Sequence, residues 1–239
     1  MPVRDVLRCL GLALMLSACT GGANHLNTTY IDRYAKPDPT PAEFYECHGF
    51  GCAETSRVSL SNDEWRRVAA VFKPPAANAA AERRQIARGV AMMQMMVGRQ
   101  TGTAAHQWTH RDMMILPNNS DPTQLDCIDE AVNTWTYLTL IEKSRLLRFH
   151  RVAPLSYAGS VVTLDQRNTA VLQQIAGGDY FAIDPSLVDA GAPPPIMPLA
   201  TWMGHWPPDL AAGEARAPPT PSARSRTGPR HQSNQVGNL

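Results

Sequence analysis

The apolar residues of this chain change their spacing near residue 145, and this change limits the folds that the chain can adopt. Two segments before it carry apolar residues at helical spacing, namely Ile86, Val90, Met93 and Val97 in one and Ile128, Ala131, Val132, Trp135, Leu138 and Ile141 in the other. The segments after it are short, rich in strand-forming residues and bounded by turn signals. We therefore expect an α+β fold, with N-terminal helices followed by an antiparallel β-sheet.

Three helices are expected, and two of them have a recognisable start. Ser61 and Glu64 form a capping box, in which each side chain satisfies the backbone amide of the other residue. Asp126 can cap a later helix with its carboxylate. The predicted helices cover residues 61–72, residues 79–97 with Gly98 as the end, and a segment that starts at Asp126.

The C-terminal half of the chain predicts strands. Gly177-Gly178 stands between two apolar runs, which is typical of a hairpin turn. A run of three prolines at 193–195 begins an extended stretch that ends at Trp202 and Trp206, and we expect it to pack back on the domain. The predicted strands are residues 147–152, 160–164, 169–175 and 180–184.

Prolines indicate the limits of the folded region. Three prolines fall within residues 37–41, which is typical of a stiff tether. From Ala211 onward the chain holds prolines and arginines but almost no bulky apolar side chains, so it cannot bury enough surface to offset its ordering entropy. We expect a tether at residues 19–43, one domain at residues 44–210 and a disordered basic tail at residues 211–239.

The first residues of the chain have the layout of a secretory signal peptide. Arg4 and Arg8 precede an apolar run over residues 10–16, and small residues stand directly before Cys19. The apolar run is much shorter than the ~20 residues that a bilayer-spanning helix needs. A cleaved signal over residues 1–18 is therefore predicted.

Leu16-Ser17-Ala18-Cys19 resembles the lipobox of bacterial lipoproteins. The resemblance implies cleavage before Cys19, acyl chains such as palmitate on that cysteine, and a protein anchored in the cell envelope by lipid. The residue after this cysteine is Thr20 and not an aspartate, which by the same resemblance implies sorting to the outer membrane with the domain facing the periplasm. The alternative is an ordinary signal peptide in which Cys19 is incidental.

The net charge bears on the partners of the chain. The formal net charge is +1, so no electrostatic attraction to nucleic acid is expected. The lipid anchor makes the membrane the first partner. Another envelope protein or peptidoglycan is expected from the location alone.

Three cysteines remain for an oxidising compartment, in which disulfides persist. Cys47 and Cys52 are separated by four residues, two of them glycines that let the chain fold back, so we expect a local disulfide. A metal knuckle with His48 is the alternative, but a second ligand pair at the usual spacing is not evident. We expect no metal and no other cofactor, and Cys127 is then the one unpaired thiol.

Cys127 is predicted at the first position of its helix. Unpaired amide donors and the positive end of the helix dipole stabilise a thiolate there, which is the reactive form of cysteine. The neighbouring acids Asp126, Asp129 and Glu130 oppose thiolate formation. The residues alone therefore leave the reactivity of Cys127 open.

The segment Asp126-Cys127-Ile128-Asp129-Glu130-Ala131 resembles the cysteine-helix motif of bacterial transglutaminase-like cysteine proteinases. Two later runs, Thr169-Ala170-Val171-Leu172 and Tyr180-Phe181-Ala182-Ile183-Asp184, resemble the strands that carry the histidine and aspartate of that family. The resemblance covers roughly residues 125–206. It implies a transglutaminase/papain-like core with Cys127 as nucleophile and Asp184 as the acidic member.

The chain departs from this family at Asn168, which stands where the family has its histidine. An asparagine amide cannot take the proton of a thiol. We therefore favour a catalytically impaired domain that acts as a binding or scaffolding module. The alternative is an active thiol hydrolase or acyltransferase on peptide or amide bonds, with Cys127 as nucleophile, His150 as displaced base and Asp184 or Asn168 as the residue that orients it.

Overall fold

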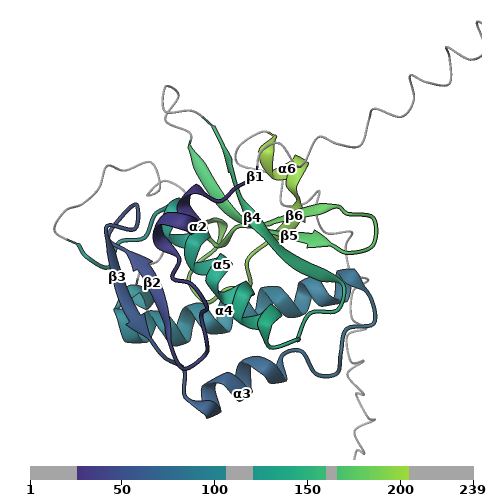
Figure 1. The fold of residues 1–239 in the computed structure, drawn as a ribbon, viewed down its shortest axis with the longest axis horizontal. Helices are drawn as coiled ribbons and strands as arrows, with labels where there is room; N and C mark the ends of the chain where they lie inside the picture. The colour runs from purple at the N-terminus through teal and green to yellow at the C-terminus, as the bar shows by residue number, and fades with distance from the viewer. Residues whose placement is uncertain (1–25, 106–120, 160–165, 205–239) are drawn as a thin grey trace, which may run out of the picture.

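The computed structural model describes residues 26–105, 121–159 and 166–204, which form an α+β arrangement (Figure 1). An antiparallel sheet has the strand order β1-β4-β5-β6-β7, and a separate hairpin pairs β2 with β3. The strands are β1 (Leu26–Asn27), β2 (Phe44–His48), β3 (Glu54–Val58), β4 (His150–Ala158), β5 (Arg167–Gln174), β6 (Tyr180–Ile183) and β7 (Ile196–Pro198). The helices are α2 (Thr29–Tyr34), α3 (Asn62–Ala70), α4 (Ala79–Thr101), α5 (Cys127–Lys143) and α6 (Leu199–Met203).

Helix α5 occupies the centre of the molecule, between the β2–β3 hairpin and the five-stranded sheet (Figure 1). Its side chains Tyr137, Leu138 and Ile141 are fully buried, and they belong to the same core cluster as Leu155 and Leu172 of the sheet. Burying one such side chain contributes about 1.5–3 kcal/mol. The packing of α5 against β5 therefore fixes the start of α5 relative to the start of β5.

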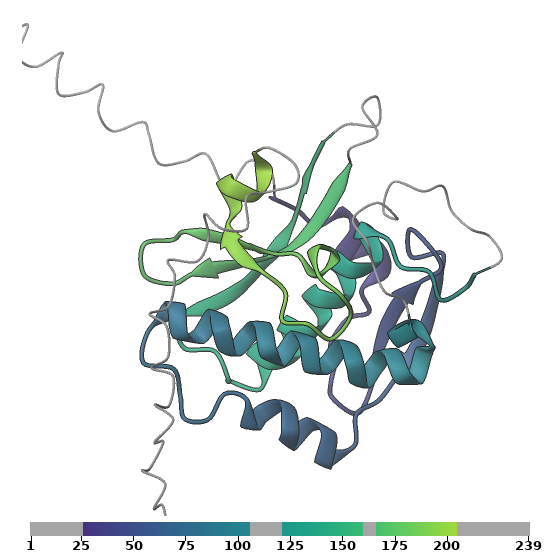
Figure 2. The same ribbon diagram turned by 180° about the vertical axis from the view of Figure 1, so that it is seen from behind.

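A smaller core covers the other face of the sheet. Val171 and Ala182 point away from α5 and pack with Met197, Leu199 and Trp202 of the C-terminal segment. Figure 2, the view from behind, shows this segment crossing in front of the sheet. The expectation that Trp202 packs back on the domain is confirmed, whereas Trp206 lies outside the described residues.

The predicted helix starts are confirmed. Ser61 Oγ accepts a hydrogen bond from the Glu64 amide, and the Glu64 carboxylate accepts one from the Ser61 amide. Helix α4 runs beyond its predicted end and stops at Gly102, which has a φ of 84°. Gly98 lies inside the helix, and a glycine suits this position because a Cβ would approach the Ala104 backbone nitrogen to 2.7 Å. Its role is close packing and not termination.

One expectation about the N-terminal region is wrong, and one hairpin there is not predicted from the sequence. Residues 26–43, which we assigned to the tether, contain β1 and α2, and both elements pack on the domain. The β2–β3 hairpin was not predicted at all, because its strands alternate too weakly in polarity. The first sheet strand is also displaced, since β4 covers His150–Ala158 and not residues 147–152. The strand predicted at 160–164 lies outside the described residues.

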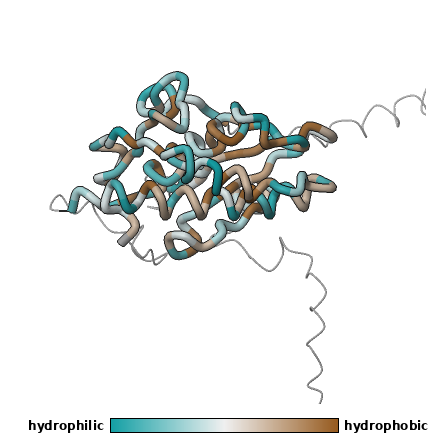
Figure 3. The backbone as a smooth tube through the Cα atoms, turned by 90° about the horizontal axis from the view of Figure 1, so that it is seen from below, coloured by the Kyte–Doolittle hydropathy of each residue, from teal (hydrophilic) through white to brown (hydrophobic). Residues whose placement is uncertain are grey.

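Hydrophobic and hydrophilic stretches alternate along the backbone, as amphipathic elements require (Figure 3). Helix α4 has 23 residues, but its sequence includes several arginines and a glutamate. Among the described residues, no helix combines the length and apolar character needed to cross a bilayer.

Candidate functional site

The start of helix α5 is fixed by a second capping box. The Asp126 carboxylate accepts hydrogen bonds from the amides of Ile128 (2.9 Å) and Asp129 (3.0 Å). The Asp129 carboxylate accepts one in return from the Asp126 amide at 2.9 Å. Cys127 is consequently the first residue of the helix, as the sequence predicts, and its side chain is half-buried.

The structure brings Cys127 and Asn168 together. The side-chain amide of Asn168 donates to the Cys127 sulfur at 3.5 Å, and the thiol faces the backbone carbonyl of Gln166 at 3.9 Å. Asn168 lies at the start of β5, opposite Tyr157 of β4. A thiol that accepts from an amide and donates to a carbonyl uses both of its hydrogen-bonding functions.

The surroundings of Cys127 favour the neutral thiol. Burial is the main cause that raises its pKa to about 12, and the charge of Asp126 raises it further. The hydrogen bonds from Asn168 oppose this rise, and the carboxylate of Asp184 adds to it. The helix N-terminus therefore does not produce a thiolate here at neutral pH.

Asp184 lies directly after β6 and is 2% exposed. Its carboxylate accepts a hydrogen bond from the Trp202 indole at 2.6 Å and others from the Ser186 hydroxyl and amide. Burial raises the pKa of Asp184, and these donors partly offset that rise. The acidic member of the expected site is thus held by Trp202 and Ser186.

Asn168 is almost fully buried, with 7% of its surface exposed. Its carbonyl oxygen, Oδ1, has no hydrogen-bond partner among the described residues. In an imidazole-based site, Asp184 would hold the far side of the ring. Only the NH2 group of the Asn168 amide, which faces Cys127, makes a hydrogen bond among the described residues.

His150 does not reach Cys127, so its predicted role as a displaced base is wrong. His150 pairs with Gln174 at one end of the β4–β5 ladder, whereas Asn168 pairs with Tyr157 near the other end. Asn168 and Gln174 are six positions apart along β5, which corresponds to roughly 20 Å. Both side chains share the α5 face of the sheet, but they lie at opposite ends of it.

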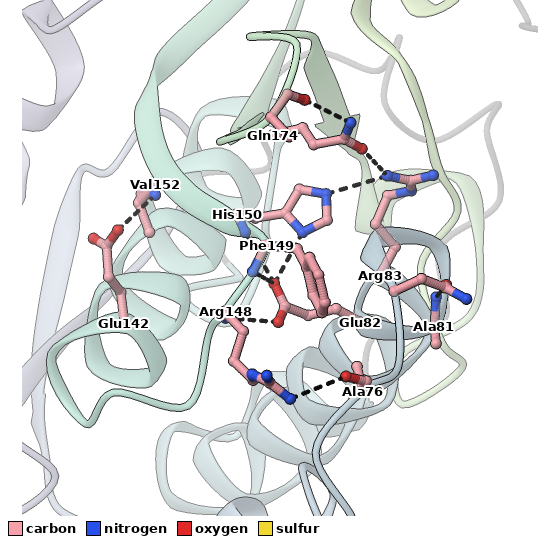
Figure 4. A network of polar contacts seen from close by, with 12 residues as sticks. Ala76, Ala81, Glu82, Arg83, Glu142, Arg148, Phe149, His150, Val152 and Gln174 are labelled. Atoms are coloured by element: carbon pink, nitrogen blue, oxygen red, sulfur yellow. Dashed lines mark hydrogen bonds and ion pairs between the residues drawn. The ribbon is translucent and has the colours of Figure 1, made fainter.

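His150 belongs instead to a buried polar network at the start of helix α4 (Figure 4). Its Nδ1 lies 3.0 Å from a Glu82 carboxylate oxygen, and its Nε2 lies 3.1 Å from an Arg83 nitrogen. The Glu82 carboxylate also accepts the amides of Arg148, Phe149 and His150 at 2.7, 2.9 and 3.0 Å. Every polar atom of the imidazole is therefore engaged in a structural role.

Sequence reasoning missed Glu82, although the sequence carries a signal for it. Glu82 is four residues before Ile86 and eight before Val90, so it continues the apolar stripe of the helix. A charged residue on such a stripe is buried and needs partners. The amides of the three residues 148–150, which lead into β4, and the imidazole of His150 supply them.

The acids that follow Cys127 are buried. Asp129 accepts from the Cys52 amide at 2.6 Å, and Glu130 accepts from the Gln94 side chain at 3.1 Å. Burial raises the pKa of Asp129 to about 8 and that of Glu130 to about 7.

Burial also raises the pKa of Glu46, which accepts a hydrogen bond from the Tyr137 hydroxyl at 2.7 Å. Glu46 and Glu130 line a cavity of about 20 Å³, which is large enough for about one water molecule.

The predicted disulfide between Cys47 and Cys52 is present. It closes the loop of the β2–β3 hairpin, and the loop is docked on α5 because Asn133 exchanges two hydrogen bonds with the Cys47 backbone, at 2.7 and 2.8 Å. The two sulfurs and the Asp129 carboxylate lie within 4.8 Å of one another. A metal would need both thiolates, so the disulfide removes these ligands.

His48, the other candidate ligand of the metal knuckle, is engaged elsewhere. Its Nδ1 contacts the Pro122 carbonyl at 2.7 Å, and its Nε2 contacts the Ser56 hydroxyl at 2.8 Å.

Cys19, the predicted lipidation site, lies outside the described residues. No protein-family model matches this chain, and neither does any curated protein or solved structure, so its functional assignment depends on the contacts around Cys127.

Proposed function

We propose that this chain is a lipid-anchored envelope protein whose domain has a transglutaminase-like fold, is catalytically impaired and acts as a binding or scaffolding module. The observation that carries the proposal is the contact of the Asn168 amide with the Cys127 sulfur, at 3.5 Å. In the family that the sequence resembles, a histidine base belongs at this position. An amide nitrogen donates a hydrogen bond but takes no proton.

The arrangement of the elements supports the fold assignment. A cysteine at the start of a central helix faces the first strand of a hairpin, and an aspartate follows the second strand. The same order of cysteine, base position and acid occurs in transglutaminase-like cysteine proteinases. The sequence motifs and this arrangement together support a domain derived from that fold.

The chemistry of the site supports the loss of activity. A thiol with a pKa of about 12 is protonated at neutral pH, and only the thiolate attacks a carbonyl. The second hypothesis, an active thiol hydrolase or acyltransferase, needs a base beside Cys127. The imidazole of His150 is held by Glu82 and Arg83 at the far end of the sheet, so no observation favours this hypothesis.

Peptide cleavage tests the impaired active site. The purified full chain is incubated with a mixed peptide library at pH 7, and the products are identified by mass spectrometry. We expect no cleavage or amide exchange beyond that of the Cys127→Ala variant. Products that form with the wild type and vanish in Cys127→Ala would establish a thiol enzyme and reject the proposal.

Fractionation tests the lipid anchor. The Cys19→Ser chain removes the predicted acyl acceptor, so it should leave the outer-membrane fraction while the wild type stays in it. The Cys127→Ser chain is the matched control, because it loses a thiol that is not an acyl acceptor. Retention of Cys19→Ser in the membrane fraction would refute the anchor.

A further inference from the structure

The N-terminal segment of the domain, residues 26–35, lies across the start of helix α5, and we name it the strap. It consists of β1 and α2 (Figure 1). In β1, Leu26 pairs with Ser156 and Asn27 pairs with Leu155 of β4. Ser156 directly precedes Tyr157, the pairing partner of Asn168, so the strap lies beside the Cys127–Asn168 contact.

Helix α2 continues the strap from β1 to the side of α5. It packs against both α5 and β4. Tyr30 and Ile31 are partly buried against the same core as Ile128, the residue that follows Cys127. The pKa of Tyr30 is raised first by burial and next by Cys127, which is consistent with a phenol close to the sulfur.

The strap is held loosely by comparison with the rest of the domain. Strand β1 has two residues, and α2 has six, none of them fully buried. The N-cap residue of α2, Thr28, makes no capping hydrogen bond with its side chain. Few buried contacts are characteristic of segments that open locally below the free energy of global unfolding.

Two polar atoms, one in the strap and one in β5, lack partners. They are the side-chain oxygens Oδ1 of Asn27 and Oδ1 of Asn168, both buried and without a hydrogen bond among the described residues. A buried acceptor without a donor is costly. Opening of the strap would expose the Asn27 oxygen to water, which offsets part of the lost packing, and the Asn168 oxygen can accept a hydrogen bond from a ligand that enters the site.

We propose that the strap is a movable cover of the Cys127–Asn168 site, and that a ligand reaches this site only after residues 26–35 lift from β4 and α5. The inference deepens the proposed function and rests on it for the nature of the ligand. It also connects the site with the anchor. Leu26 is seven positions after Cys19, so a lipid on Cys19 holds the closed strap within roughly 25 Å of the membrane surface.

Access to Cys127 is measured by alkylation with iodoacetamide at pH 9. The full chain is used, and mass spectrometry of the peptide that contains Cys127 gives the rate. We expect Tyr30→Ala to raise the rate about tenfold. Leu26→Cys with Ser156→Cys, oxidised to a disulfide, should lower it about tenfold because it locks β1 to β4. Equal rates in the wild type and in both variants would overturn the proposal.

Hydrogen exchange separates local opening from general destabilisation. The amides of residues 26–35 should exchange at least a hundredfold faster than those of residues 131–141 in α5, and the locked variant should slow only the former. Exchange of both segments at one common rate would contradict a movable strap. A wild-type Cys127 that is highly reactive but still responds to the lock would reject the proposed function and leave the strap intact.

Discussion

At the scale of single residues, the pair of Cys127 and Asn168 determines what the site can do. Its geometry suits a hydrogen bond from a nitrogen donor to sulfur, at 3.5 Å. Asn168 is buried at the start of β5, which holds its side chain beside the sulfur. The chemistry of the site therefore depends on one side chain.

The first prediction concerns Asn168→His. An imidazole at this position lies within reach of the sulfur, and an imidazolium stabilises the thiolate. The alkylation rate of Cys127 at pH 7 should rise at least tenfold over the wild type. Asn168→Asp is the control, because its negative charge opposes the thiolate and should not raise the rate. An unchanged rate in Asn168→His would show that residue 168 does not control the thiol.

A second residue-scale prediction concerns Glu82, whose carboxylate accepts three backbone amides and the imidazole of His150. Glu82→Ala leaves these buried donors unpaired, which should cost about 3–5 kcal/mol in the free energy of unfolding by urea. Glu43→Ala, at an exposed ion pair with Arg57, should change it by about 0.5 kcal/mol or less. Equal effects of the two substitutions would contradict the role assigned to Glu82.

At the scale of elements, α5 organises the site because its first two turns bind the β2–β3 hairpin. Asp129 holds the Cys52 amide, and Asn133 holds the Cys47 backbone. The strap covers the same end of the helix. The outer edge of β4 is protected against pairing with a strand of another molecule. Pro154 has no amide hydrogen, and the Val152 amide donates to the Glu142 carboxylate.

The elements that could be predicted are those whose cause is local. The capping boxes at Ser61 and Asp126 and the hairpin at Gly177-Gly178 need only neighbouring residues. The strap and the β2–β3 hairpin depend on partners more than 80 residues away, such as Asn133 for Cys47. The same reason applies to the site. The position of Asn168 beside Cys127 could be predicted from the order of the motifs along the chain, whereas the position of His150 depends on the register of the strands.

At the scale of the whole molecule, buried carboxyls make the stability depend on pH in two opposite ways. The pKa of Glu82 is lowered, because hydrogen bonds from His150 and backbone amides outweigh the effect of burial. Its contribution is complete above the unfolded-state pKa and is lost as the pH falls through the lowered value. The pKa values of Asp129 and Glu130 are raised by burial, so the folded state binds protons that the unfolded state has released.

The raised values predict that stability falls as the pH rises. Between the ordinary carboxyl pKa values and about 7 for Glu130 or about 8 for Asp129, the folded chain holds more protons than the unfolded chain. Glu130→Gln removes one such group, so it should flatten this decline and stabilise the chain at pH 8 by roughly 2 kcal/mol. Urea unfolding of both chains from pH 5 to pH 9 measures this change in the free energy of unfolding. An unchanged slope would show that Glu130 ionises normally.

The alkylation rate of wild-type Cys127 as a function of pH tests the central claim most directly. The urea-unfolded chain supplies the reference for an exposed thiol, and mass spectrometry reports on the Cys127 peptide in both states. We predict that the folded chain reacts at least tenfold more slowly than the unfolded chain at pH 7, with a rate that still rises at pH 9, because the thiol pKa is about 12. A rate that reaches its plateau below pH 7 would reveal a stable thiolate and contradict the account.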